Sequence, residues 1–248
     1  MRKLFSAYLC ILSLNSFAQN KPVIYQQQSW AGYFLQVKFS KHWGIGFDSE
    51  IHTNDNYFNG FSQVTFRLAG TYYNNKQNKF SVGYGYSDFF PGENHKYISI
   101  PEQFAWQQYQ WYHYSKKTKL MQWVRIEEKF KNDVIDNYTA ANSYTLTYKA
   151  RYNIFYQISL NKKGMIPRSL SLAMGNELYL YYGPHIQNQV FDQNRIFLGF
   201  SYLVNAHDNL QFGVMNILQK DVSGNQFKDN NVLRISFFQN IGLIRHSE

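Results

Sequence analysis

The chain has 248 residues and a formal net charge of +9; 19% of the residues are aromatic and only 17% are charged. This aromatic content excludes an intrinsically disordered chain, and the single cysteine, Cys10, excludes a scaffold held by disulfides. No run of about 18 apolar residues occurs, which excludes a transmembrane helix.

Residues 1–18 are predicted to be a signal peptide. Arg2 and Lys3 precede a short apolar stretch at 4–14, and Ser16 and Ala18 provide the small residues at a cleavage site before residue 19. The alternative is a short helix at the start of the mature fold. We expect residues 19–27 to form an N-terminal arm and residues 28–248 to form one barrel domain.

From residue 28 onward, apolar and polar residues alternate with a period of two, which is typical of β-strands. The stretch 43–52 is an example, because it places Trp, Ile and Phe on one face and Gly, Asp, Glu and His on the other. The pattern predicts an all-β chain with strands near 28–39, 42–52, 59–74, 79–88, 102–115, 119–131, 143–156, 168–181, 191–204, 208–218 and 231–243.

The predicted connections alternate between short polar turns, such as 40–41 and 115–119, and longer loops, such as 88–101, 132–142 and 219–230. This alternation and the strand lengths are typical of a transmembrane β-barrel with short periplasmic turns and longer outer loops. We therefore predict a transmembrane antiparallel up-and-down β-barrel of 10–12 strands. Twelve strands are preferred, because bacterial single-chain barrels have even counts.

A membrane barrel places its apolar face toward lipid, since its backbone is satisfied only by closure of the sheet. Tyr and Trp near strand ends should then form girdles at the two interfaces. The expected girdle residues are Trp30, Trp43, Tyr72, Tyr86, Trp111, Tyr112, Trp123, Tyr181 and Tyr202.

The opposite face of the strands carries most of their charges, and these residues should line the lumen. In antiparallel neighbours, residues equally far from the centre of the connection lie opposite each other. This places Glu177 beside Arg195 and beside Lys149, and it places Glu127 between Arg125 and Lys149. The network could fill a narrow lumen, or it could line an anion-preferring pore. The predicted lumen residues are Lys38, Asp48, Glu50, Arg67, Glu102, Arg125, Glu127, Lys129, Lys149, Arg151, Glu177, Arg195 and Arg234.

The sequence contains no catalytic, metal-binding or phosphate-binding motif, so we expect no enzymatic activity, metal or cofactor. One alternative is a hydrolase at the outer rim that acts on lipid or peptide and uses Asp55, His95, His185 and Asp192. Another is a soluble periplasmic ligand-binding barrel. The basic residues form no cluster that would indicate binding to nucleic acid.

Six short motifs occur in an order that is similar to a known family. They are WAGY at 30–33, GYGY at 83–86, WQQ at 106–108, RIEEKF at 125–130, NELY at 176–179 and FDQNR at 191–195. From Gln28 to Leu243 the chain resembles domain of unknown function 2490, a Bacteroidota family of uncharacterised outer-membrane β-barrels. Lys129 departs from the arginine expected there and keeps the charge. The resemblance implies location and fold, and it implies no activity.

Together these patterns predict an exported, non-enzymatic barrel of the outer membrane. It would serve as a narrow channel or as a structural or surface protein with a charged interior. Its expected partners are outer-membrane lipid and small solutes or ions, and no nucleic acid.

Overall fold

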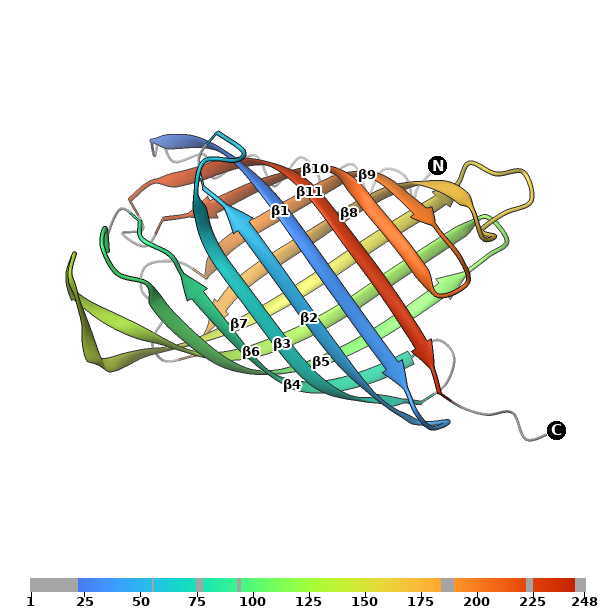
Figure 1. Ribbon diagram of the computed structural model, residues 1–248, viewed down its shortest axis with the longest axis horizontal. Coiled ribbons are helices and arrows are strands. Elements are labelled where there is room, and N and C mark those ends of the chain that lie inside the picture. Colours follow the sequence, from blue (N-terminus) through green and yellow to red (C-terminus); the bar gives the residue numbers. More distant parts are fainter. Residues whose placement is uncertain are drawn as a thin grey trace, which may run out of the picture.

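A computed structural model describes residues 22–54, 56–74, 78–92, 95–183, 190–221 and 225–243. In this part of the chain eleven strands form a closed barrel, which confirms the predicted all-β fold (Figure 1). No helix among these residues is long and apolar enough to span a membrane. The strands are β1 (Val23–Lys38), β2 (Trp43–Thr53), β3 (Phe61–Tyr73), β4 (Asn78–Phe89), β5 (Ile100–Tyr114), β6 (Thr118–Asp136), β7 (Thr139–Ser159), β8 (Ser169–Tyr182), β9 (Phe191–Leu203), β10 (Asp208–Lys220) and β11 (Phe227–Gly242).

Every strand pairs with its chain neighbours in antiparallel fashion, and β1 closes the barrel against β11 in parallel. The parallel seam follows from the strand count, because an odd number of alternating strands brings the first and last strands together in the same direction. The count lies within the predicted range and is one below the preferred twelve. β1 begins at Val23, so residues 23–27, expected in the N-terminal arm, belong to the sheet.

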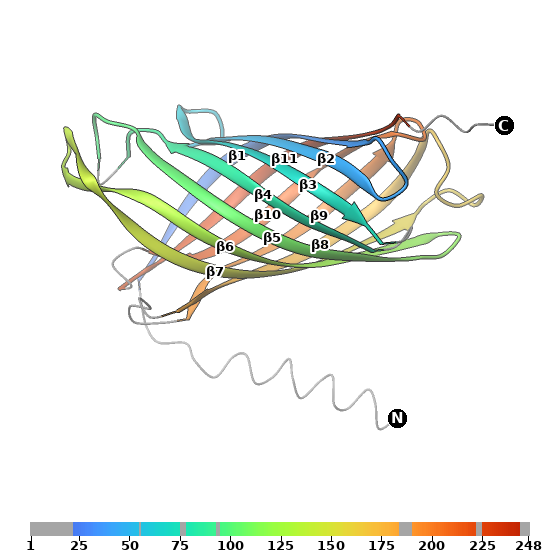
Figure 2. The same ribbon diagram turned by 90° about the horizontal axis from the view of Figure 1, so that it is seen from below.

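Successive connections between strands lie alternately at the two ends of the barrel (Figure 2). The end that holds the β1–β2, β3–β4, β5–β6, β7–β8 and β9–β10 connections is here named the turn end, and the opposite end is named the loop end. The loop expected at 132–142 is mostly strand, because β6 and β7 continue to a two-residue turn at Asn137 and Tyr138. Tyr138 stacks on Tyr97 from the β4–β5 loop with ring centroids 4.5 Å apart, so the hairpin and the loop support each other.

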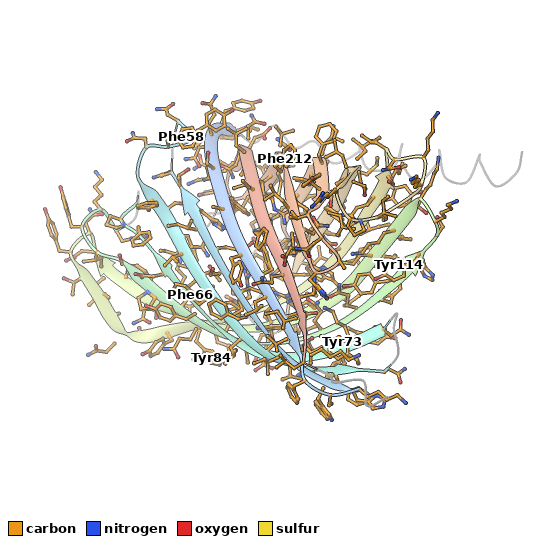
Figure 3. All side chains as sticks on the ribbon, turned by 45° about the vertical axis from the view of Figure 1, so that its right-hand side comes forward. Phe58, Phe66, Tyr73, Tyr84, Tyr114 and Phe212 are labelled. Carbon is orange, nitrogen blue, oxygen red and sulfur yellow. The ribbon has the colours of Figure 1, made fainter. Side chains whose placement is uncertain are left out.

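The outer surface of the barrel is apolar. Leu68 is 60% exposed and Leu198 is 53% exposed, and Phe66 and Tyr84 also project from the outside of the sheet (Figure 3). The residues between them along each strand, such as Arg67, face inward. This is the arrangement of a sheet that faces lipid, and it is the opposite of a soluble barrel with an apolar core.

Four of the expected girdle residues face inward instead of toward lipid. Trp30 and Trp123 are each 9% exposed, Tyr112 lines an interior cavity, and the ring of Tyr181 contacts the Lys149 ammonium. Each of the four lies an even number of residues from an inward charge on its own strand, so its side chain points to the same face. This alternation decides its direction more strongly than its position near a strand end. Trp43, Tyr72 and Tyr86 are exposed on the outer surface, as predicted.

Large rings fit inside the narrow barrel because they lie flat on glycines of the neighbouring strand. A Cβ atom on Gly83 would lie 2.5 Å from the Trp106 ring and 2.6 Å from a backbone oxygen. Gly85 faces the Phe104 ring in the same way, and a Cβ on Gly175 would lie 2.6 Å from Phe155. Because these glycines have no side chain, the rings can lie close against the backbone, and part of the lumen stays open.

Candidate functional site

The interior of the barrel contains an ion-pair layer centred on Glu127 of β6, whose side chain is 2% exposed. Its Oε1 lies 2.5 Å from Arg151 Nη1 and 3.6 Å from Arg125 Nη1, and its Oε2 lies 4.0 Å from Lys129 Nζ. Arg151 also binds Glu177 of β8. One buried carboxylate therefore serves as counterion for three cations on two adjacent strands.

Further ion pairs surround this layer. Toward the loop end, Lys129 Nζ lies 2.6 Å from Glu102 Oε1 on β5, and Lys149 Nζ lies 2.8 Å from an oxygen of Asp192 on β9. A buried charge is costly unless an opposite charge lies beside it, and these contacts give each carboxylate a nearby ammonium group.

A third ion pair connects β2 with β3. Arg67 Nη1 donates a 2.8 Å hydrogen bond to Glu50 Oε2, and both side chains are largely buried. Ion-paired residues of the network thus lie on β2 and β3 and on β5 through β9.

Aromatic rings lie beside the guanidinium groups of the layer. The Arg125 guanidinium lies 4.2 Å from the Trp106 ring centroid and 5.1 Å from that of Trp123. The Arg151 guanidinium lies 5.2 Å from the Trp123 centroid and 4.2 Å from that of Tyr179. Cations over ring faces gain electrostatic stabilisation, and the rings hold each guanidinium in one orientation. The Nε of Arg125 also donates to Gln108 Oε1 at 2.8 Å.

Four of the predicted lumen residues have no ion-pair partner within 4.0 Å in the described part of the chain. Asp48, Arg195 and Arg234 line the central cavity, and Lys38 lies 4.5 Å from the Tyr73 ring centroid at the turn end. All thirteen predicted residues face the interior, as their strand parity requires, and nine of them form ion pairs.

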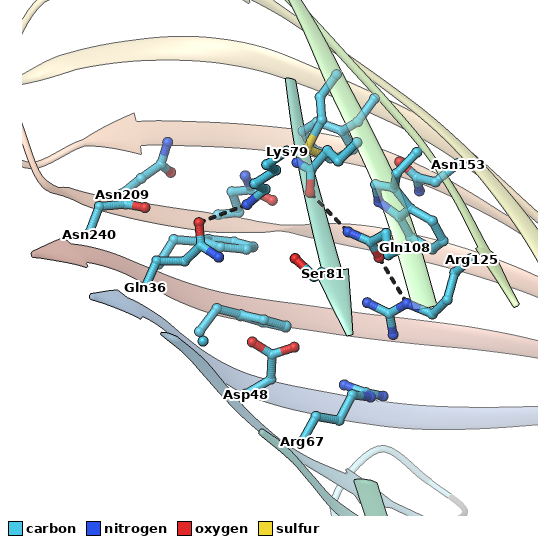
Figure 4. Close-up of a pocket in the computed structure, with 18 of the residues that line it drawn as sticks. Gln36, Asp48, Arg67, Lys79, Ser81, Gln108, Arg125, Asn153, Asn209 and Asn240 are labelled. Atoms are coloured by element: carbon cyan, nitrogen blue, oxygen red, sulfur yellow. Dashed lines mark hydrogen bonds between the residues drawn. The ribbon is translucent and has the colours of Figure 1, made fainter. Parts of the chain in front are cut away.

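A cavity of about 410 Å³ occupies the lumen between the ion-pair layer and the turn end (Figure 4). Glu127 and Lys129, which lie one step closer to the loop end, do not line it. Amide side chains such as Gln36 and Gln108 alternate with charged groups on its wall, and Figure 4 shows Asp48, Arg67, Lys79 and Arg125 around the space. Its charged lining comprises Asp48, Glu50 and Glu177 against Arg67, Lys79, Lys119, Arg125, Arg151, Arg195 and Arg234.

A second cavity of about 480 Å³ lies at the turn end and shares lining residues with the first. Lys119, Gln157 and Asn209 belong to both walls, so the two spaces adjoin. The lining of the second cavity includes Lys116 and Lys163 and no acidic residue. The central cavity therefore continues toward the turn end through a basic vestibule.

The predicted partners inside the network are correct in part. Glu177 is in register with Arg195, and Glu127 with Lys149, but each carboxylate binds Arg151 instead. The predicted pair of Lys149 and Glu177 is wrong. The true register is offset from the centre of the β7–β8 connection, and it places Glu177 opposite Asn153.

Asp192, Lys79 and Lys119 are among the charged residues of the lumen that sequence reasoning missed. Asp192, which binds Lys149, follows Phe191 at the irregular start of β9, where the register with β8 shifts. Lys79 and Lys119 lie near the starts of β4 and β6. Lys79 was the first residue of the predicted strand 79–88 but was not assigned to the lumen, and Lys119 was expected in the turn at 115–119. Lys79 Nζ donates to Gln36 Oε1 at 2.7 Å, and Lys119 covers the rings of Tyr112 and Tyr114. The parity of the other inward residues on these two strands would have placed both lysines inside.

The residues considered for a rim hydrolase are not assembled among the described residues. Asp192 is 1% exposed and forms the interior ion pair with Lys149, so it does not lie free at the rim. His95 Nδ1 lies 2.8 Å from the backbone oxygen of Ile98. Asp55 and His185 lie outside the described residues, and in the described ranges no group of three or more His, Cys, Asp or Glu side chains could hold a metal.

The chain belongs to the family described as "Protein of unknown function (DUF2490)", whose pattern matches residues 27–228. This confirms the family resemblance. Among solved structures, the fold is similar to that in "NanC porin structure in rhombohedral crystal form", with a TM-score of 0.50 and 11% sequence identity. The match covers 86% of this chain and 98% of the porin chain. No curated protein matches the sequence.

Proposed function

We propose that this protein is a non-enzymatic barrel of the outer membrane whose lumen is a narrow, anion-preferring channel. The observation that carries the proposal is the charge of the central cavity, whose lining has seven basic and three acidic side chains. The apolar outer surface supports a location in lipid, and the similarity in fold to a porin is consistent with an outer-membrane barrel.

The excess of basic over acidic side chains on the cavity wall favours anions electrostatically. A fixed excess of positive charge on the wall attracts anions into the lumen and repels cations. The wall also limits screening, because charges in a narrow space of low dielectric interact more strongly than charges in bulk water. The basic residues of the vestibule, Lys116, Lys119 and Lys163, extend this field to the turn end.

The size of the barrel supports passage of small solutes only. Eleven strands lie between the eight-stranded barrels that side chains fill and the porins of 16–18 strands with wide channels. The layer around Glu127, Arg151 and Glu177 occupies the lumen on the loop side of the cavity. Solutes must pass between these side chains, so we expect low unitary conductance.

Planar lipid bilayers test the proposal directly. The purified barrel should give small, steady single-channel currents in potassium chloride, and the reversal potential in a salt gradient should show chloride preferred over potassium. Substitution of both Lys79 and Lys119 by Gln should move the reversal potential toward zero, because it removes two cavity charges. Substitution of Lys162, which is exposed in the β7–β8 connection, should leave the reversal potential unchanged.

Silent bilayers would refute the channel and support the other predicted role, a structural barrel with a filled interior. Cation preference would refute the charge argument. Location is tested separately by membrane fractionation, in which the protein should sediment with outer-membrane markers. Unheated protein should also migrate faster than boiled protein on a gel, and extraction as a soluble periplasmic protein would contradict the proposed location.

A further inference from the structure

Two arginines of the central cavity differ from the other interior arginines. Arg67, Arg125 and Arg151 each lie within 4.0 Å of a carboxylate. Arg195 of β9 and Arg234 of β11 line the same cavity, and no described carboxylate lies within 4.0 Å of either guanidinium. They therefore have no direct ion-pair partner among the described residues, although Glu177 interacts electrostatically with both arginines and Glu50 with Arg234 at longer range.

Neutral groups nevertheless hold both guanidiniums in place. Arg195 Nε donates a 3.0 Å hydrogen bond to Gln193 Oε1, and Arg234 Nε donates a 3.2 Å hydrogen bond to Ser236 Oγ. In each case the acceptor is two residues away on the same strand. These anchors occupy the Nε–H and leave the two Nη groups, which can bind an oxyanion through paired hydrogen bonds.

Aromatic rings support the faces of both groups. The Arg195 guanidinium lies 4.8 Å from the ring centroid of Trp30 and 4.4 Å from that of Tyr179, and Arg234 lies 5.1 Å from the centroid of Phe197. Trp30 is also in register with Arg234, so one indole borders both arginines. The rings lie against the flat faces of the two guanidinium groups, so the Nη edges remain available to a ligand in the cavity.

Trp30 is a rigid part of this arrangement. Its ring stacks on His52 with centroids 3.7 Å apart, and its indole N–H donates to Gln28 Oε1 at 3.0 Å. A side chain held on both sides costs little additional entropy when a ligand binds beside it.

We propose that Arg195 and Arg234 form an oxyanion-binding site that recognises the carboxylate or phosphate group of a small solute inside the lumen. The inference rests on the proposed channel for its route of access and goes beyond it in ligand class, because general anion preference would treat chloride and oxyanions alike. A paired fork matches the two oxygens of a carboxylate or phosphate and has no such match with a spherical halide.

Equilibrium binding in detergent tests the site without any need for conduction. The full barrel would be titrated with inorganic phosphate, and in a separate arm with acetate, at constant ionic strength maintained with chloride. Tryptophan fluorescence is the readout, since Trp30 borders both arginines. We expect a saturable change with phosphate, acetate or both, and the two arms distinguish the phosphate from the carboxylate source.

The variants separate paired recognition from simple charge. Arg195→Gln and Arg234→Gln should each weaken binding by about tenfold or more, because each removes charge-assisted hydrogen bonds. Arg195→Lys and Arg234→Lys keep the charge and remove the fork, and they should also weaken binding. Lys162→Gln is the control, because it removes an exposed positive charge that lines neither cavity and should change binding by less than about twofold.

Several results would overturn the site. They are the absence of saturable binding by wild type, equal binding by the Gln variants, or Lys variants that bind like wild type. Gel mobility of unheated samples shows whether each variant forms the barrel, and the Lys variants decide the question where a Gln variant does not fold. A silent barrel that binds phosphate would refute the channel and keep the site, whereas a conducting barrel without saturable binding would refute the site and keep the channel.

Discussion

Glu127→Gln is the substitution that most directly tests the interior network. The change preserves the shape of the side chain and removes the carboxylate that lies 2.5 Å from Arg151 Nη1 and 3.6 Å from Arg125 Nη1. Arg151 retains Glu177, and Lys129 retains Glu102 at 2.6 Å. Arg125 is the one cation of the three that loses its only carboxylate within 4.0 Å among the described residues.

The expected loss in the free energy of unfolding depends on which cations keep a carboxylate. Removal of one partner from a buried ion pair costs about 3–5 kcal/mol, because an uncompensated charge stays behind. Two of the three cations keep a second carboxylate, and Arg125 keeps the faces of Trp106 and Trp123. We therefore expect a loss at the lower end of the range, about 3 kcal/mol in the free energy of unfolding.

Equilibrium unfolding in urea from lipid vesicles, followed by tryptophan fluorescence, measures this loss. A double-mutant cycle with Arg125→Gln isolates the pair, and we expect a coupling free energy of about 1 kcal/mol or more. The reasoning is refuted if Glu127→Gln costs less than about 1 kcal/mol, or if the two single losses simply add in the double variant. In bilayers, the same variant should prefer chloride more strongly than wild type does, since the interior loses a negative charge.

Three further predictions concern the barrel wall and the interior ion pairs, and Gly70→Ala is the control for the first. Gly83→Ala should lower the free energy of unfolding by about 1–3 kcal/mol, since its Cβ would meet a ring and a backbone oxygen. Gly70→Ala, with nothing within 4 Å of its Cβ, should change that free energy by less than about 0.5 kcal/mol. Leu198→Arg should cost about 2–4 kcal/mol in vesicles, and a near-neutral result would contradict a lipid-facing surface. Asp192→Asn should cost about 3 kcal/mol in the same assay because Lys149 loses its carboxylate, and an unchanged barrel would place Asp192 outside the network.

Period-two alternation was sufficient to predict the fold and the inward position of the charges. Charged groups that face lipid are costly, so selection on membrane-spanning strands leaves a strong parity signal in the sequence. This is why all thirteen predicted lumen residues face inward, including those that are the only predicted charge on their strand, such as Arg67 of β3 and Arg234 of β11. The same parity rule assigns Lys79 and Lys119 correctly once the strand ends are known.

Pairing inside the lumen could not be predicted from the same signal. A partner depends on register and on the reach of long side chains, and neither follows from alternation along one strand. Arg151 binds Glu127 and Glu177 at once, although Glu127 is in register with Lys149 and Glu177 with Arg195. Position near a strand end was a weaker guide than parity for aromatic residues, as the inward rings of Trp30, Trp123, Tyr112 and Tyr181 show.

Closure of the barrel also depended on information that the alternation did not contain. Expectation of an even strand count rested on what bacterial barrels usually do, and no residue pattern specified the partner of the first strand. The parallel pairing of β1 with β11 resolves the odd count without an additional crossing. The alternation also did not predict that β6 and β7 continue to the turn at Asn137 and Tyr138. Polar residues beyond the lipid zone form a regular hairpin there without an apolar face.

The unequal pairing of interior charges argues for a solute-related role. Stability alone gives little reason for a charged lumen, since well-packed apolar residues often replace buried ion pairs at no cost. Cations without a direct ion-pair partner are more costly still, and Arg195 and Arg234 are such groups beside the central cavity, with Glu50 and Glu177 at longer range. A mobile anion from solution can supply the direct contact that these two guanidinium groups lack. The cavity charge and the two arginines without a direct ion pair therefore both support the proposed reversible occupancy of the lumen by small anions.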